Sequence, residues 1–254
     1  MNGNIIAVRG LQKDYGGFTA VKGIDFDVKE GEIFGLLGPN GAGKSTTLEI
    51  LETLRKKSAG QVHINGWDLD TNSEKIRQII GVQLQASGYY PGLTLVELLR
   101  LFAGLYNRKI RPMDYLELVN LTDKAGFKYK QLSGGQQQRF SIATTLINQP
   151  KLVFLDEPTT GLDPQARRNL WDLIERIREQ GATVVLTTHY MDEAEVLCDR
   201  VGIIDSGRII AMDRPGKLID ELLDSGFTPR KNIKSANLED VFIHLTGKAL
   251  RPGA

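Results

Sequence analysis

The stretch GPNGAGKST at residues 38–46 constrains the fold of this chain more than any other feature. It fits the spacing G-x-x-x-x-G-K-[ST], in which glycines allow backbone N–H groups to turn toward a bound phosphate. The apolar run EIFGLLG at 32–38 precedes it, and KSTTLEILETL at 44–54 follows with apolar residues at helical spacing. A strand, a glycine loop and a helix in this order are the context that a phosphate-binding loop, or P-loop, requires.

The P-loop predicts a set of contacts to a nucleotide. Lys44 is expected to reach the β- and γ-phosphates, and the Ser45 hydroxyl is expected to ligate Mg²⁺. The remaining phosphate contacts are expected from Gly38, Pro39, Asn40, Gly41, Ala42, Gly43 and Thr46. At ordinary glycine usage, a chance match to this spacing in a chain of this length is on the order of one in a hundred.

Two acidic residues follow a second apolar run, LVFLDEP at 152–158. This order places Asp156 and Glu157 at the carboxyl end of a buried strand, where open α/β sheets bind ligands. Asp156 is expected to hold Mg²⁺, directly or through water, and Glu157 to polarise an attacking water. Taken alone, the pair is also compatible with an acidic turn before Pro158. Together with the P-loop, it predicts a nucleotide triphosphatase.

The stretch LSGGQQQRFSIATTL at 132–146 begins with a serine and two glycines and continues as a helix. Such a helix start can bind an anion. The P-loop already serves one nucleotide, so Ser133, Gly134 and Gly135 are predicted to serve a second nucleotide held by another molecule. A plain N-capped helix is the alternative, and it explains the serine but not the adjacent glycines.

The order of strand and helix patterns predicts an α/β fold. Strand patterns at 5–11 and 20–28 and a hairpin at 60–69 predict an N-terminal antiparallel β subdomain. Helical patterns predominate from about residue 86 to 145, and continuous apolar strands then return on both sides of a helix that starts near Pro164. The prediction is a P-loop NTPase core of the RecA-like type with an inserted α-helical subdomain. The ATPase domain is expected over 1–220, with the helical subdomain at about 86–145, and a short helical tail over 221–254.

Composition narrows the possible partners and compartment. A formal net charge of +1 gives no electrostatic reason to expect nucleic acid or an anionic membrane surface. The basic clusters at 55–57 and 128–130 are interpreted as solvated faces. No apolar run approaches the ~18 residues that cross a bilayer, and the first ten residues lack a secretory pattern. Cys198 is the only cysteine, which predicts a reducing compartment.

LSGGQ, with the P-loop before it and LVFLDEP after it, resembles the nucleotide-binding domain of ABC transporters. The resemblance extends from about Ile5 to Thr246. It implies a head-to-tail dimer with a second copy or a related ATPase subunit, in which two ATP molecules lie between the subunits. Each ATP would contact one subunit's P-loop and the other's signature, residues Ser133 to Gln136 here (Ser133, Gly134, Gly135 and Gln136). Such a pair is a closed two-fold assembly.

The resemblance also assigns residues near the nucleotide. Tyr15, in KDYGG, matches the aromatic residue that stacks on adenine, and Phe18 is a weaker candidate for the same position. Gln85, in IGVQLQ, matches the glutamine that contacts Mg²⁺ and water and senses the transmembrane partner. Gln83 lies nearby and is the alternative.

Two further residues match positions of the family that act across the dimer or on the γ-phosphate. Asp163, in TTGLD, matches the loop that communicates between the subunits. His189, after TVVLTT, matches the switch histidine that contacts the γ-phosphate and steadies Glu157. His63 and His244 have no such context and are interpreted as structural.

The sequence favours transport among the roles of such ATPases. It has one P-loop, no heptad insertion and no cysteine cluster, unlike family members that act in translation, chromosome organisation or DNA repair. The stretches 187–219 and 238–251 resemble exporter ATPases of the bacterial drug-resistance and multidrug class. The stretch 224–237 is shorter than the extended tail of many of these exporters. A soluble ATPase with a non-membrane partner and an importer ATPase remain alternatives.

The resulting expectation is Mg²⁺-dependent ATP hydrolysis that drives a separate membrane permease through dimer closure. The helical block that contains residues 86–99 is expected to form the groove for a permease helix, with Tyr89 and Tyr90 as lining candidates. The chain is expected in the cytoplasm, at the inner face of the cell membrane, with no nucleic-acid partner.

Overall fold

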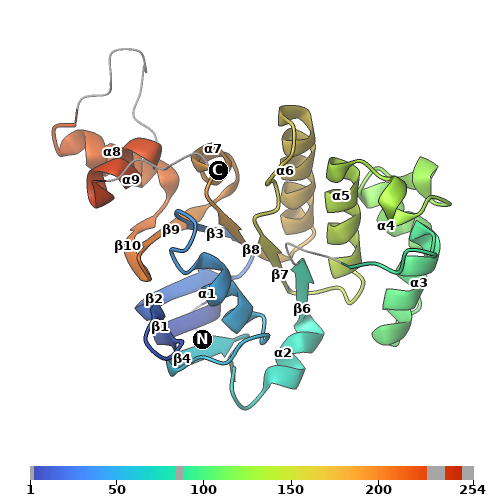
Figure 1. The fold of residues 1–254 in the computed structure, drawn as a ribbon, viewed down its shortest axis with the longest axis horizontal. Helices are drawn as coiled ribbons and strands as arrows, with labels where there is room; N and C mark the ends of the chain where they lie inside the picture. The colour runs from blue at the N-terminus through green and yellow to red at the C-terminus, as the bar shows by residue number, and fades with distance from the viewer. Residues whose placement is uncertain (1–2, 84–87, 228–237, 248–254) are drawn as a thin grey trace.

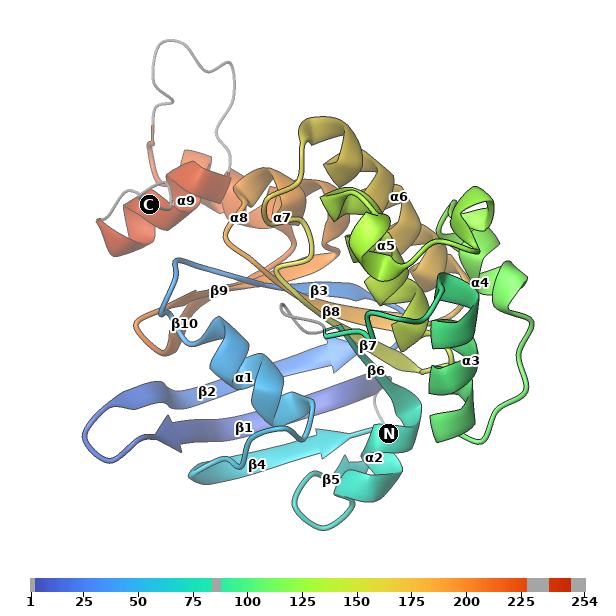
Figure 2. The same cartoon turned by 45° about the vertical axis from the view of Figure 1, so that its right-hand side comes forward.

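The computed structural model describes residues 3–83, 88–227 and 238–247, and two β-sheets organise them (Figure 1). The helix that follows the P-loop, α1 (Lys44–Leu51), lies between the two sheets (Figure 2). The remaining helices cover the other face of the larger sheet or extend from its edges. The fold is therefore α/β, as the sequence predicts.

The smaller sheet is antiparallel and has the strand order β2-β1-β4-β5. Its strands are β1 (Asn4–Asp14), β2 (Thr19–Lys29), β4 (Ala59–Ile64) and β5 (Trp67–Asp68). Asn65 and Gly66 connect β4 to β5 with φ values of 51° and 78°. Positive φ at both turn residues matches the twist of a two-residue hairpin, which explains the Asn-Gly sequence at this point.

The larger sheet has the strand order β10-β9-β3-β8-β7-β6. Its strands are β3 (Ile33–Leu37), β6 (Ile80–Gln83), β7 (Leu152–Asp156), β8 (Thr183–Thr188), β9 (Arg200–Asp205) and β10 (Arg208–Asp213). Neighbouring strands are parallel from β6 to β9, and β10 adds an antiparallel edge. Parallel strands covered on both faces require apolar residues throughout, and β3 is buried along its whole length.

From residue 88 onward, where the structure describes it, the predicted helical stretch contains three helices and two 3₁₀ turns. These are α3 (Leu95–Leu105), α4 (Pro112–Leu118), η1 (Thr122–Lys124), η2 (Tyr129–Gln131) and α5 (Gly134–Thr145). Thr94 and Glu97 form a capping box that starts α3. The division into a domain over 1–220 and a tail over 221–254 stays a prediction.

The other helices flank the strands of the larger sheet. They are α2 (Ser73–Ile79), α6 (Pro164–Glu179), α7 (Met191–Leu197), α8 (Pro215–Asp224) and α9 (Leu238–Thr246). The apolar pattern alone does not indicate α2 and α7, each of which is seven residues long. None of the helices in the described part of the chain combines the length and the apolar character needed to cross a bilayer.

Alternate residues of β3 face two separate apolar cores. Ile33 and Leu37 pack among the helices on one face of the larger sheet. Phe34 and Leu36 point the other way, toward α1 and the smaller sheet. The rings of Phe34 and Phe26 stack with centroids 5.5 Å apart, which joins the two sheets through an aromatic contact.

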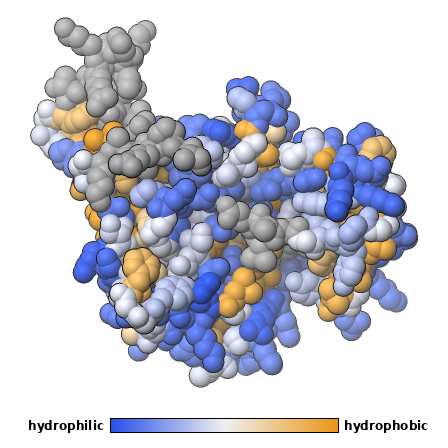
Figure 3. All heavy atoms as spheres, in the orientation of Figure 1, coloured by the Kyte–Doolittle hydropathy of each residue, from blue (hydrophilic) through white to orange (hydrophobic). Residues whose placement is uncertain are grey.

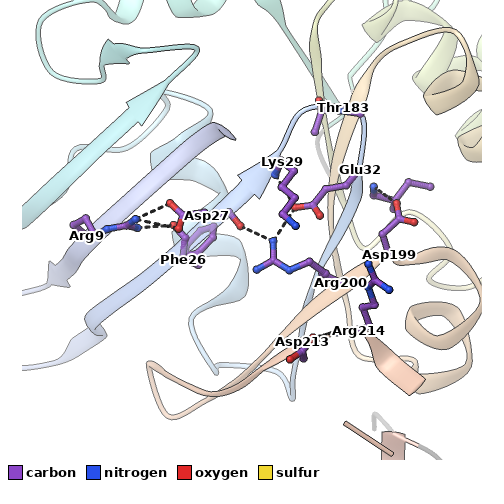
Figure 4. Close-up of polar contacts among 12 residues, drawn as sticks. Arg9, Phe26, Asp27, Lys29, Glu32, Thr183, Asp199, Arg200, Asp213 and Arg214 are labelled. Atoms are coloured by element: carbon purple, nitrogen blue, oxygen red, sulfur yellow. Dashed lines mark hydrogen bonds and ion pairs between the residues drawn. The ribbon is translucent and has the colours of Figure 1, made fainter. Parts of the chain in front are cut away.

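A partly buried ion pair also joins the sheets (Figure 4). Arg200 Nη1, at the start of β9, lies 3.1 Å from Glu32 Oε1 and donates to the Asp27 carbonyl oxygen at 3.2 Å. The same Glu32 oxygen accepts the N–H of Lys29 at 2.7 Å. Asp199 accepts the first N–H of β3 at 2.8 Å. These contacts fix the end of β2 against the start of β3, and β3 leads into the P-loop.

Candidate active site

The P-loop lies between β3 and α1, as its sequence context predicts. Gly43 precedes α1 with φ of 106°, a conformation that favours glycine. At Gly38, a Cβ would lie 2.1 Å from the Ile204 carbonyl oxygen, so only glycine allows β9 to approach the loop this closely. Glycine at these two positions therefore has a steric cause within the chain.

The Lys44 side chain folds back over the loop. Its Nζ donates to the carbonyl oxygens of Gly38 at 2.9 Å and Pro39 at 3.2 Å, and the residue is 4% exposed. Burial lowers the pKa of Lys44, and the nearby Glu157 and Asp156 carboxylates offset part of that effect. The ammonium is thus held within the loop by two carbonyl groups.

Asp156 and Glu157 follow one another at the end of β7, and one residue of β8 orients both. The Thr187 hydroxyl donates to Asp156 Oδ1 in a short hydrogen bond and accepts the N–H of Glu157 at 3.0 Å. Ser45 Oγ donates to the same Asp156 oxygen at 3.2 Å. Glu157 has φ of 46°, so the chain turns sharply there and directs the side chain toward the loop. Nothing in the sequence indicates Thr187, which lies within an apolar strand.

The Glu157 carboxylate has three polar neighbours. Its Oε1 lies 3.2 Å from Lys44 Nζ, and its Oε2 accepts the Thr160 hydroxyl at 3.2 Å. His189 Nδ1 lies 3.2 Å from Oε2, within ion-pair distance, and this buried nitrogen has no hydrogen-bond partner among the described residues. Burial raises the pKa of Glu157, but Lys44 and His189 together outweigh burial and hold the pKa below its ordinary value. Glu157 is therefore a carboxylate at neutral pH.

An open pocket of about 740 Å³ lies in front of the P-loop. Its lining consists of Tyr15, Phe18, Ala20, Asn40, Gly41, Gly43, Lys44, Ser45, Thr46, Arg55 and Glu157. Three other predicted residues support the loop instead: Gly38 and Pro39 hold Lys44, and Ala42 is 3% exposed. The structure thus brings the two aromatic candidates to the same pocket as the P-loop.

Arg55 is a member of this pocket that the sequence did not indicate. The basic cluster at 55–57, to which it belongs, predicts a solvated face instead. Its guanidinium carbon lies 5.3 Å from the centre of the Tyr15 ring, and Lys13 Nζ lies 5.0 Å from the same centre. Arg55 also pairs with Glu49, and this hydrogen bond raises the pKa of Arg55. Two cations beside an aromatic ring form a surface suited to a polar ring and its attached phosphates.

The signature serine caps α5. Ser133 Oγ accepts the N–H of Gln136 at 3.4 Å, and Gln136 Oε1 accepts the N–H of Ser133 at 2.9 Å. Asp163 caps α6 in a similar way, and its Oδ1 accepts the N–H groups of Gln165 and Ala166 at 2.9 and 2.8 Å. These two caps fix the residues at which α5 and α6 begin.

Ser133, Gly135, Gln136 and Asp163 line a second pocket of about 200 Å³, together with Arg139. The structure therefore unites the predicted signature with the predicted dimer-communication residue. This pocket shares no residue with the pocket at the P-loop. Arg139 is a further member that sequence reasoning missed, because it lies within a helix that showed no motif beyond its start.

The two signature glycines have different surroundings. A Cβ at Gly135 would lie 2.9 Å from the Ala166 Cβ, so glycine there permits close packing of α5 against α6. A Cβ at Gly134 would meet nothing within 4 Å. Helical packing therefore accounts for Gly135, whereas nothing in the described chain requires glycine at position 134.

The predicted glutamine near Mg²⁺ and the two predicted groove tyrosines lie apart from these two pockets or outside the described residues. Gln85 lies outside the described residues, and Gln83, its alternative, ends β6 and is 1% exposed. Tyr89 packs within the helical block, where its hydroxyl lies 3.2 Å from Ser141 Oγ. Tyr90 is 67% exposed.

A family model described as ABC transporter matches residues 21–160 of this chain. The linearmycin resistance ATP-binding protein LnrL of Bacillus subtilis (strain 168) is 40% identical over 223 residues, which cover 86% of this chain and 72% of LnrL. The Nod factor export ATP-binding protein I of Ralstonia nicotianae is 42% identical over 221 residues, covering 85% of this chain and 68% of the relative.

Solved structures show the same fold. An ATP-binding subunit of an ABC transporter superposes with a TM-score of 0.81 at 28% identity, covering 95% of this chain and 99% of that chain. A dimeric, post-hydrolysis state of the ATP-binding cassette MJ0796, bound to ADP and Pi, gives 0.74 at 30% identity, with 82% and 98% covered. CbiO1 from Clostridium perfringens, part of the ABC transporter complex cbiONQ, gives 0.78 at 29% identity, with 87% and 92% covered.

Proposed function

The chain belongs to the ABC transporter family as an ATP-binding, ATP-hydrolysing subunit, and from that premise we propose that it drives an exporter by ATP-dependent closure of a head-to-tail dimer. One observation carries the proposal. The Glu157 carboxylate is held between Lys44 and His189, beside the hydrogen-bonded pair of Ser45 and Asp156. A carboxylate in this position can accept the proton of a water that attacks the γ-phosphate.

Ser45 and Asp156, which lie close to Lys44, offer oxygen atoms that suit a magnesium ion. Ser45 Oγ and Asp156 Oδ1 are oxygen ligands that already lie 3.2 Å apart. Among the described residues, no group of three or more His, Cys, Asp or Glu side chains is arranged to hold a metal. Mg²⁺ needs only one or two protein ligands when substrate phosphates and waters complete its coordination shell. When bound with ATP, Mg²⁺ would supply positive charge that offsets the negative charge of the triphosphate.

The other residues of the pocket take part as follows. Lys44 binds the β- and γ-phosphates through its ammonium, and the N–H groups of the P-loop bind them through the backbone. Tyr15 stacks on adenine, with Arg55 beside it. His189 contacts the γ-phosphate and holds Glu157 in place, and Thr187 fixes the backbone from which Glu157 projects.

Dimer closure would complete the site. The pocket of Ser133, Gly135 and Asp163 is separate from the P-loop pocket of the same chain, which supports its use by the partner's nucleotide. Open space at Gly134 allows a phosphate to approach the backbone at the start of α5. ATP then stabilises the closed pair, because only the dimer provides both halves of each site. Hydrolysis removes the γ-phosphate that connects them.

Relatives support export as the direction of transport. Two relatives at 40% and 42% identity are named for linearmycin resistance and for Nod factor export. The chain would act at the inner face of the membrane, through a permease that supplies the membrane-spanning part. A groove of about 360 Å³ between the end of α1 and the helical block is the proposed docking place of that permease. Phe102 and Tyr106 line this groove, and Tyr89 and Tyr90 do not.

The test uses tagged Glu157→Gln protein, purified with ATP and Mg²⁺ from mildly solubilised membranes of the native host. The expected result is a stable ATP-bound dimer that carries a polytopic membrane protein without its own P-loop. Reconstitution of that membrane protein with the unsubstituted chain should then give substrate export that depends on ATP. Ribosomal, DNA-repair or exclusively soluble partners would overturn the transport proposal and leave the ATPase intact. ATP-driven uptake would reverse the direction.

A further inference from the structure

A buried carboxyl group lies in the groove between the end of α1 and the helical block. Glu52, the residue that ends α1, contributes to the lining of this groove of about 360 Å³. Leu54 lies on the same side, and Phe102, Tyr106 and Thr144 lie on the side of α3 and α5. Figure 3 shows apolar side chains at the surface over α3, beside the indentation between the helices and the body that contains the sheets.

Glu52 is buried without a complete set of partners. The residue is 3% exposed, and its Oε1 has no hydrogen-bond partner among the described residues. Buried carboxyl groups are normally paired or hydrogen-bonded, because removal from water without compensation is unfavourable. A carboxyl group of this kind in the wall of an open groove indicates a ligand that supplies the missing partner.

The charges around Glu52 show what that partner must be. Burial, followed by the charges of Asp156 and Glu49, raises the pKa of Glu52 to about 8, and no cation counteracts them. Arg77 lines the same groove, but its Nε donates to the Thr53 hydroxyl at 2.8 Å. Arg55 pairs with Glu49 instead. Neither of these two arginines forms an ion pair with Glu52 among the described residues.

We propose that Glu52 pairs with a lysine or arginine side chain of the permease segment that docks in this groove. The inference rests on the proposed function, because it takes the permease as the occupant. Leu54 is 59% exposed and Tyr106 is 45% exposed, so an amphipathic helix can cover both with its apolar face. Its cation then reaches Glu52 below them. A segment without a cation would leave Glu52 without this partner, so Glu52 selects among permeases.

The membrane protein that copurifies with Glu157→Gln is reconstituted in lipid nanodiscs. The experiment then measures the affinity of the chain for this permease. The parent chain is compared with Glu52→Gln, which keeps the shape but cannot form the carboxylate that pairs with a cation. Glu74→Gln is the control. It removes an exposed carboxylate from α2, the helix that precedes β6, and Ile80 and Val82 of β6 line the groove. The expected result is affinity weakened by about thirtyfold or more for Glu52→Gln, since one partner of a buried charge pair is lost. Glu74→Gln should stay within about threefold of the parent, as exposed charges contribute little.

Two further variants identify the partner residue and separate loss of the ion pair from loss of folding. Glu52→Lys should abolish binding, and a lysine or arginine in the permease replaced by glutamate should restore it. Glu52→Asp retains an ionisable carboxyl group and should bind more tightly than Glu52→Gln. Thermal unfolding establishes that each variant is folded. Equal affinity of the parent and Glu52→Gln would overturn the inference while the proposed function stands. Failure of the parent chain itself to bind the nanodiscs would overturn both.

Discussion

The Nζ of Lys44 and the Oε1 of Glu157 lie 3.2 Å apart, so the P-loop lysine and the carboxylate after β7 form a buried ion pair. The two side chains are 4% and 10% exposed. In the proposed mechanism an incoming γ-phosphate replaces Glu157 as the partner of Lys44. Nucleotide binding thereby releases the carboxylate that acts on water, which links the occupancy of the site to its readiness for hydrolysis.

The first prediction concerns Glu157→Gln. The amide cannot accept the proton of the attacking water, so kcat should fall by about a hundredfold to ten-thousandfold. ATP affinity should be equal to or higher than that of the parent, because Lys44 no longer pairs with a carboxylate. Phosphate release and a fluorescent-nucleotide titration measure the two quantities. Glu175→Gln, on the exposed face of α6, is the matched control. Unchanged hydrolysis in Glu157→Gln would show that another group is the base.

The second prediction contrasts the two signature glycines. Gly135→Ala would place its Cβ against Ala166 and should destabilise the monomer by about 1–3 kcal/mol, with recovery in the Ala166→Gly background. Gly134→Ala has free space and should stabilise the helix by up to about 1 kcal/mol. It should nevertheless prevent ATP-dependent dimerisation, because the methyl group blocks the partner's phosphate. Ser133→Arg should likewise spare ATP binding and prevent the dimer.

Calorimetry and sedimentation in the presence of ATP measure these effects. A Gly134→Ala protein that dimerises and hydrolyses ATP normally would contradict the role of the signature across the dimer. A Gly135→Ala protein as stable as the parent would show that α5 and α6 can move apart without cost.

The third prediction concerns adenine. Tyr15→Ala should weaken ATP binding by roughly tenfold, because stacking of a base on an aromatic ring contributes about 1–3 kcal/mol. Tyr15→Trp should retain the affinity, and Tyr90→Ala, which is exposed elsewhere, should have no effect. Isothermal titration with a non-hydrolysable ATP analogue gives the constants. If Phe18→Ala lowers affinity and Tyr15→Ala does not, the stacking role belongs to Phe18.

The fourth prediction concerns the ion pair that joins the two sheets. Arg200→Met leaves Glu32 buried without its cation and should lower the free energy of unfolding by about 3 kcal/mol. Adding Glu32→Gln should restore part of this loss, because the amide has no charge to compensate. Urea unfolding of the four proteins of the double-mutant cycle measures the coupling. Strictly additive losses would mean that the pair contributes only through its separate contacts.

The fifth prediction is a pH dependence that originates at Glu52. Its pKa of about 8 in the folded chain exceeds the ordinary value of 4.5, so the folded state holds a proton that the unfolded state releases. Stability from this group is therefore fully present below pH 4.5, falls as the pH rises, and is lost above about 8. Relative to the parent, Glu52→Gln should gain in Tm progressively across this range when both are unfolded in EDTA. A Tm difference that does not vary with pH would contradict the raised pKa.

The sequence was sufficient for features that depend on local spacing. The P-loop pattern, with a strand before it and a helix after it, predicted Lys44 and Ser45 at one site. Asn65-Gly66 predicted a hairpin, because only particular residues tolerate positive φ at both turn positions. Continuous apolar runs predicted buried parallel strands, because such strands are covered on both faces.

The sequence did not indicate residues whose role depends on contacts between distant segments. Thr187 orients Asp156 and Glu157 from a neighbouring strand, and nothing in its own strand marks it. The sequence around Arg55 is typical of a solvated basic cluster, and only the fold shows that Arg55 lies beside Tyr15. The sequence around Glu52 is typical of the end of a helix. Only the packing of the folded chain shows that Oε1 of Glu52 is buried without a hydrogen-bond partner among the described residues.

The sequence by itself therefore determined the chemistry of this protein, because a phosphate-binding loop and a strand-end carboxylate are short patterns with fixed local geometry. Tertiary structure alone decided which groups share a pocket. It separated the signature with Asp163 from the P-loop, and it placed Lys44, Glu157 and His189 within 3.2 Å of their partners. The physical reason is that burial and charge pairing depend on distances across the fold, and spacing along the chain does not encode them.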